Sequence, residues 1–155
     1  MSNVLNFDSG IINLVVNGDA SKVFSFNPTD SRIYEGFFKL IDETTMKLEA
    51  MTKEAETLEA KRNDMSDEEY AKAELLLRSE CDKILRDGFD EIFGAGAAET
   101  LFGSQNITAL GKNGDYIFAN AMMAIVPYFE SETKARRRKV QEIIQDHKPK
   151  AKKKK

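Results

Sequence analysis

The sequence predicts a mainly α-helical protein: a small N-terminal β-hairpin packed on a helical hairpin, a central apolar helix, and a disordered basic C-terminal tail. Three observations predict it. Two short apolar runs surround an Asn-Gly pair, apolar residues recur every three or four positions through two long segments, and a nearly continuous apolar run lies near residue 120. A chain of 155 residues is long enough to bury a core, so we expect one domain over 1–133 and a basic helical extension with a disordered tail over 134–155.

The first element is the predicted β-hairpin. Ile12, Leu14 and Val16 occupy alternate positions before Asn17-Gly18, and a second apolar run follows over 22–26. Asn-Gly is the preferred pair for a tight hairpin turn. An isolated hairpin is marginally stable in water, so this one is expected to pack on the helices that follow.

Two amphipathic helices come next and predict an antiparallel helical hairpin. Thr29 or Asp30 can cap the first helix, whose apolar stripe runs over 33–58 and includes the core candidates Phe37 and Leu40. Because large apolar groups thin out after residue 53, that end is expected to protrude or to pair with a neighbouring helix.

The second helix has clear start and stop signals. Ser66, followed three residues later by Glu69, forms a capping box, and Gly94 and Gly96 end the apolar pattern. Gly88 interrupts the helix, which weakens it relative to alanine but permits a bend or close packing.

The remaining elements are a short helix over 97–102, a loop over 103–114 and a final helix over 116–129. The final helix is apolar almost all round, so we expect it to be buried centrally. Pro127 is expected to kink it or to end its regular part, and a polar helix over 131–145 is expected beyond.

Charge is distributed unevenly along the chain. Residues 134–155 contain 11 basic and 2 acidic side chains, a net charge of +9, and the overall charge of −3 leaves −12 on residues 1–133. Such a basic tail either contacts nucleic acid or an acidic protein surface, or it solubilises the end of the chain and folds back on the acidic body. The sequence leaves both interpretations open.

No catalytic, cofactor or metal site can be assembled from the sequence. The glycines at 94–99 begin like a dinucleotide fingerprint, but they follow a helix instead of a strand and the third glycine is missing. His147 and Cys81 are the only histidine and the only cysteine, too few for a zinc site. Cys81 falls on the apolar stripe of its helix, where core packing is the expected role. We predict no enzyme, no cofactor and no metal.

The chain is also expected to be cytoplasmic. No stretch approaches the roughly 20 apolar residues that span a bilayer, so no membrane association is predicted. The first residues lack the basic and apolar regions of a secretion signal, and a single cysteine cannot form an internal disulfide.

The order of several short motifs resembles the tail assembly chaperones of long-tailed phages (siphoviruses) and prophages of Gram-positive hosts. The resemblance covers residues 11–130. It includes the N-terminal strands, the Phe26-Asn27-Pro28-x-Asp30 entry, the acidic helical hairpin, Ile92-Phe93-Gly94-x-Gly96, Leu101-Phe102-Gly103 and the apolar helix near Pro127. It implies a helical, non-enzymatic protein that coats the tape-measure protein and recruits the major tail protein during virion assembly.

An exposed apolar helix edge suits this role, because methionine and aromatic side chains adapt to partner helices. Exposed stripes and a free hairpin edge also predict a homo-oligomer. The candidate partner-binding residues are Tyr34, Phe38, Met46, Met51 and Leu58.

An alternative is a helical adaptor whose basic tail binds nucleic acid through Arg136, Arg137, Arg138 and Lys139. The acidic body and the lack of interleaved aromatic residues disfavour this as the main role. The lysine run at 152–155 has a second interpretation, because lysine codons can form a slippery adenine tract. Programmed frameshifting, which the family often uses, is therefore a hypothesis for this end of the gene.

Overall fold

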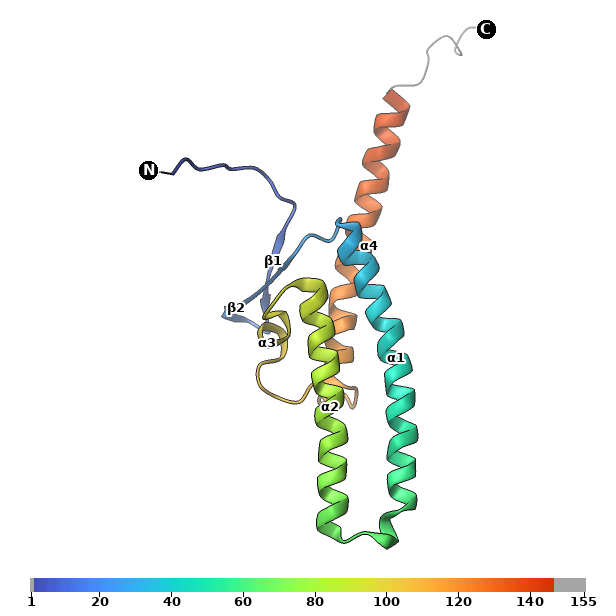
Figure 1. The fold of residues 1–155 in the computed structure, drawn as a ribbon. Helices are drawn as coiled ribbons and strands as arrows, with labels where there is room; N and C mark the ends of the chain where they lie inside the picture. The colour runs from blue at the N-terminus through green and yellow to red at the C-terminus, as the bar shows by residue number, and fades with distance from the viewer. Residues whose placement is uncertain (1, 147–155) are drawn as a thin grey trace, which may run out of the picture.

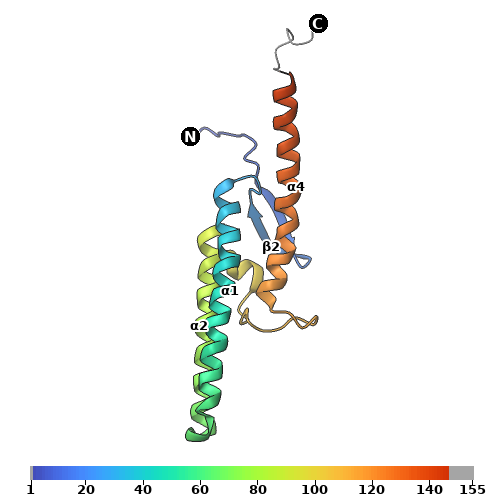
Figure 2. The same cartoon turned by 90° about the vertical axis from the view of Figure 1, so that its right-hand side faces the viewer.

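The computed structural model describes residues 2–146, without the side chains of 132, 133, 136, 137 and 146, and it confirms a mainly helical fold with an N-terminal β-hairpin. The elements are β1 (Ile12–Val16), β2 (Asp19–Phe26), α1 (Ser31–Ala60), the 3-10 helix η1 (Arg62–Asp64), α2 (Asp67–Phe93), α3 (Ala97–Phe102) and α4 (Ile117–Asp146). Figures 1 and 2 show α1 and α2 as a long antiparallel hairpin, with the strands, α3 and the first part of α4 gathered around one half of it.

The β-hairpin forms as predicted. Asn17 and Gly18 have φ values of 49° and 76°, the positive angles that a type I′ turn requires. Val15 pairs with Val23 but Val16 pairs with Asp19, so 20–22 bulge out of the ladder beside the turn. On the inward face of β2, Phe24 and Phe26 are buried against the helices, which confirms that the hairpin packs on them.

The ends of α1 and α2 follow the sequence signals. Asp30 caps α1 by accepting a hydrogen bond from the Arg32 backbone N–H at 3.0 Å, and Ser66 caps α2 by accepting one from the Glu69 N–H at 3.1 Å. The side chains satisfy N–H groups that have no partner inside the helix. Gly94 then ends α2 with a φ of 108°.

Gly88 provides close packing between the two helices. A Cβ atom at this position would lie 2.6 Å from Cδ1 of Leu40, so α2 can approach α1 this closely only because the side chain is absent. Phe37 and Leu40 are buried, as the apolar stripe predicted, and so is Cys81.

A cluster of aromatic rings forms the centre of the core and joins elements that are far apart in the sequence. Phe129 of α4 lies 5.1 Å from Phe37 of α1 and 5.4 Å from Phe26 of β2, measured between ring centroids. Phe93 of α2 lies 4.9 Å from Phe24 of β2. The strands, the helical hairpin and α4 are therefore held by one shared set of contacts.

Helix α4 differs from the expectation in two ways. It continues through Pro127 as one helix to Asp146, so Pro127 does not end it and the predicted polar helix over 131–145 is its second half. The proposed domain boundary at residue 133 therefore falls inside α4. Met123, whose carbonyl loses its partner at Pro127, is exposed together with the proline, so water can solvate that carbonyl. Burial is also one-sided, because Phe118, Met122, Ile125 and Phe129 face the core while Met123 and Tyr128 stay exposed. The predicted disordered tail over 147–155, including the lysine run, lies outside the described residues.

Candidate protein-binding surfaces

Within residues 2–146, no group of three or more His, Cys, Asp or Glu side chains is arranged to hold a metal ion. In the same span, no helix combines the length and apolarity needed to cross a bilayer. Burial raises the pKa of the Cys81 thiol, and the neighbouring Asp82 carboxylate raises it further, so the thiol is kept in its less reactive protonated form.

The five predicted partner-binding residues of α1 fall into different environments. Met46 is the most accessible, with 69% of its surface exposed. Tyr34 is partly exposed, but its ring packs 4.8 Å from Phe38, which is half-buried against the core. Met51 and Leu58 are also half-buried, and Met51 packs against the core cluster. Only Met46 and one edge of Tyr34 are presented to a partner without rearrangement.

Sequence reasoning missed two adjacent leucines on α2. Leu75 and Leu76 are 64% and 61% exposed. Both lie off the stripe that includes Ala73, Leu77 and Cys81, so they face away from α1. Their position outside the apolar stripe was the signal in the sequence that could have identified them as exposed. Together with Met46 they leave apolar groups on the outer faces of the helical hairpin.

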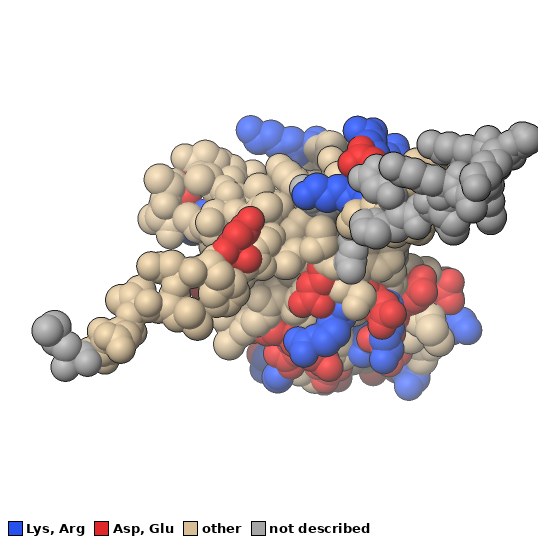
Figure 3. All heavy atoms as spheres, turned by 90° about the horizontal axis from the view of Figure 1, so that it is seen from above, with Lys and Arg blue, Asp and Glu red and all other residues tan. Residues whose placement is uncertain are grey.

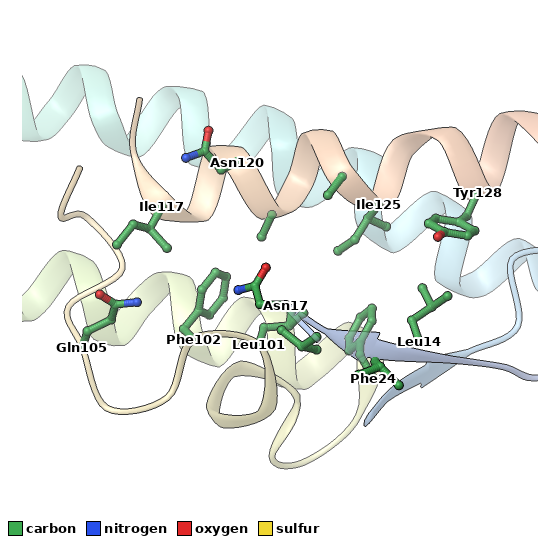
Figure 4. Close-up of a pocket in the computed structure, with 14 residues that line it drawn as sticks. Leu14, Asn17, Phe24, Leu101, Phe102, Gln105, Ile117, Asn120, Ile125 and Tyr128 are labelled. Carbon is green, nitrogen blue, oxygen red and sulfur yellow. The ribbon is translucent and has the colours of Figure 1, made fainter. Parts of the chain in front are cut away.

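A groove of about 530 Å³ lies between the β-hairpin, α3 and α4 (Figure 4). We call it the β1–α4 groove. Its α4 wall is a stripe at helical spacing that includes the small residues Ala121 and Ala124. The complete lining is Leu14, Val15, Val16, Asn17, Phe24, Leu101, Phe102, Gln105, Ile117, Asn120, Ala121, Ala124, Ile125 and Tyr128.

One wall of this groove depends on polar contacts from α2. Arg86 donates hydrogen bonds to the carbonyls of Gly103 and Gln105, each at 2.6 Å, and its guanidinium pairs with Asp82. Asp82 also accepts a hydrogen bond from the Ile107 N–H at 2.7 Å. Charge-assisted bonds of this kind fix the loop after α3, and thereby position the α3 side of the groove.

A second contact from α2 orients α3 itself. The Asp90 carboxylate accepts a hydrogen bond from the Ala98 N–H at 2.8 Å, and so caps a short helix that has no side-chain cap of its own. Nothing in the sequence singles out Asp90 from the other carboxylates of α2. Its partner lies eight residues away and could not be identified from helix periodicity.

Charged side chains cover other parts of the surface. Figure 3 shows basic and acidic groups intermixed on one side and a broad uncharged area beside them that continues into the N-terminal segment. Several charges on α2 form exposed pairs one helical turn apart, such as Lys83 with Asp87 at 2.7 Å. Arg138 and Lys139 are exposed on α4, whereas the side chains of Arg136 and Arg137 lie outside the described part.

Comparison with models of known protein families, with curated proteins and with solved structures finds no match in any of the three. The motifs that carry the family resemblance nevertheless have definite places in the fold. Gly94 and Gly103 end α2 and α3 with positive φ angles of 108° and 65°. Phe93 and Phe102, which precede them, pack in or against the core. Both motifs are helix ends.

Proposed function

We propose that this chain is a non-enzymatic tail assembly chaperone of a long-tailed phage or prophage, acting in the cytoplasm of the host cell. It holds the tape-measure protein and helps to recruit the major tail protein while the tail tube polymerises. The observation that carries the proposal is the exposure of large apolar side chains on the outer faces of long helices, including Met46, Leu75, Leu76 and Met123.

These side chains suit a helical client. A tape-measure protein is a long helical chain whose apolar stripes need cover before the tube surrounds them. Leucine and methionine on a helix face supply i, i+3 and i+4 contacts to such a stripe, and methionine adapts to many sequences. Binding through apolar helix faces requires no catalytic group. The family resemblance over residues 11–130 supports the same role.

Co-expression with a tape-measure protein of a long-tailed phage tests the proposal. Replacing Met46, Leu75 and Leu76 by Asp is expected to return that partner to the insoluble fraction, because three charges would be desolvated in the contact. These positions are exposed in the folded chain, so the variant should still fold. Asp at Met51 or Leu58 is a poorer test, since both are half-buried.

A matched control carries the same added charge at polar positions of the same helices. Thr45, Thr57 and Ser79 are exposed, and their replacement by Asp should leave the partner soluble. A chain lacking residues 147–155 should also retain activity. If the apolar variant solubilises the partner as well as the control does, the proposal is wrong.

A second function is favoured by one observation. Lys134, Arg138 and Lys139 are exposed on the part of α4 that projects beyond the helical hairpin (Figure 1). An adaptor that binds nucleic acid through this extension predicts submicromolar binding that weakens steeply with salt. Gel-shift titrations over a range of salt concentrations separate the two functions, since the chaperone role predicts only weak binding by the full chain.

A further inference from the structure

The N-terminal arm, residues 2–11, carries large apolar side chains that are not covered by the rest of the molecule. Val4, Leu5 and Phe7 are 79%, 84% and 75% exposed. Figures 1 and 2 both show the arm leaving β1 and pointing away from the rest of the molecule. Exposing three large apolar side chains on one short segment to water is unfavourable. The arm is therefore expected to bind a protein surface that covers them.

The end of the arm that precedes β1 is fixed against the rest of the molecule. Asn27 donates a hydrogen bond from Nδ2 to the Ser9 carbonyl at 3.2 Å, and Asp8 accepts one from the Gly10 N–H at 2.9 Å. Gly10 has a φ of 74°, and a Cβ there would lie 2.7 Å from Asn27 Nδ2. The arm therefore leaves the fold in a defined direction, away from the turn end of β1.

The β1–α4 groove has the shape that an extended segment needs. It is lined by the consecutive residues Leu14, Val15, Val16 and Asn17. Because successive strand residues point to opposite faces, contact with Leu14, Val15 and Val16 places the groove along the edge of the strand. The described sheet has only two strands, so this edge of β1 lacks a neighbouring strand. An added strand could pair there with the backbone of β1.

The chemistry of the arm matches the chemistry of the groove. Residues 2–7 contain no charged side chain, and neither do the residues that line the groove, although 32% of the chain is charged. In an extended arm Leu5 and Phe7 point to the same side. Ala121 and Ala124 on α4 leave room for two such side chains, while the side-chain amides of Asn17 and Gln105 can satisfy polar backbone groups.

The course of the arm argues for a groove on another molecule. The arm begins at the end of β1 opposite the Asn17-Gly18 turn, whereas the groove lies beside the turn end. To fill its own groove the arm would have to reverse at Gly10 and give up its contact with Asn27. Residues 2–8 span roughly 23 Å when extended, which is enough to reach across to a second copy.

We propose that the N-terminal arm of one copy of this chain docks as an added strand in the β1–α4 groove of another copy, with Leu5 and Phe7 against α4. This exchange links copies of the chain, and it stands whether or not the client is a tape-measure protein. It covers the free edge of β1 and the arm's apolar groups in a single contact.

Complementation between two blocked variants tests the exchange. Leu5→Asp with Phe7→Asp blocks the arm, and Ala124→Glu blocks the groove; all three positions are exposed, so both variants should fold. By light scattering after size exclusion, wild type should exceed the monomer mass of 17.5 kDa, and each variant alone should be monomeric. An equimolar mixture retains one intact arm and one intact groove, and it should form a species of twice the monomer mass.

Two matched controls add the same charge outside the contact. Ser2→Asp with Asn6→Asp alters the other side of the arm, and Met123→Glu alters the residue beside Ala124 that does not line the groove. Both should assemble as wild type does. Variants that assemble normally, or a mixture that stays monomeric, would overturn the proposal. Capture of the tape-measure protein by the arm-blocked variant reports on the chaperone function separately.

Disulfide trapping distinguishes a neighbour's arm from the chain's own. Differently tagged Leu5→Cys and Ala124→Cys chains should cross-link on oxidation, whereas Leu5→Cys with Met123→Cys should not. The native Cys81 is buried and should contribute no background. If a chain that carries both new cysteines cross-links only to itself, and wild type is monomeric, the arm fills its own groove and the exchange is refuted.

Discussion

Truncating Phe129 to alanine tests whether α4 is held in the core beyond its proline. The ring is fully buried and lies between α1 and β2, 5.1 Å from Phe37, 5.4 Å from Phe26 and 5.6 Å from Tyr34. Replacing a buried phenylalanine by alanine typically costs about 3–5 kcal/mol. With several aromatic partners lost at once, we expect a value in the upper half of that range.

Equilibrium unfolding in urea, followed by circular dichroism, measures this loss. For a domain of this size a loss of about 4 kcal/mol corresponds to a fall in Tm of roughly 8–16 °C. Phe129→Leu keeps most of the volume and should cost about 1–2 kcal/mol. Met123→Ala, on the exposed side of the same helix, should cost less than about 0.5 kcal/mol.

The comparison between Phe129 and Met123 has a clear refuting result. If Phe129→Ala and Met123→Ala lower the free energy of unfolding equally, α4 is not anchored by Phe129. In that case the helix would separate from the core near Pro127.

Three further predictions concern local features of α2. Arg86→Ala should lower the free energy of unfolding by about 1–3 kcal/mol and speed hydrogen exchange over residues 103–108, because two carbonyls lose their donor; unchanged exchange would contradict the assigned contacts. Cys81 should react with a thiol reagent only after unfolding. Because its folded pKa is raised, the contribution of Cys81 to stability should be complete below the ordinary thiol pKa and decline as pH rises through the folded value, a decline absent from Cys81→Ala. Ser66→Ala should cost about 1 kcal/mol through loss of the α2 cap, and Ser66→Asp should restore most of it.

Local signals in the sequence predicted local structure well. The Asn17-Gly18 turn, the Asp30 and Ser66 caps and the helix end at Gly94 all depend on a few adjacent residues, and the structure confirms each. Gly88 also acts as one of the two expected alternatives, a point of close packing.

Long-range contacts were outside the reach of that reasoning. Arg86 bonds to carbonyls seventeen and nineteen residues away, and no periodicity marks it as different from the other basic residues of α2. The continuation of α4 through Pro127 depends on Met123 and Pro127 facing water, which is known only once the opposite face is docked.

The candidate surfaces show the same division. Periodicity on α1 identified Met46 as exposed, but it could not decide that Met51 and Leu58 turn partly toward the core. The β1–α4 groove was not predicted at all. Its walls come from four separate parts of the chain, and its polar rim depends on a loop fixed by α2.

The sequence by itself determined the order of strands and helices, the caps and ends of α1 and α2, and the separation of an acidic body from a basic C-terminus. Only the tertiary structure decided which apolar side chains remain in water and where the free strand edge meets a helix. The physical reason is that capping and helix or strand periodicity act over a few neighbouring residues. Burial, in contrast, depends on which faces of distant elements meet.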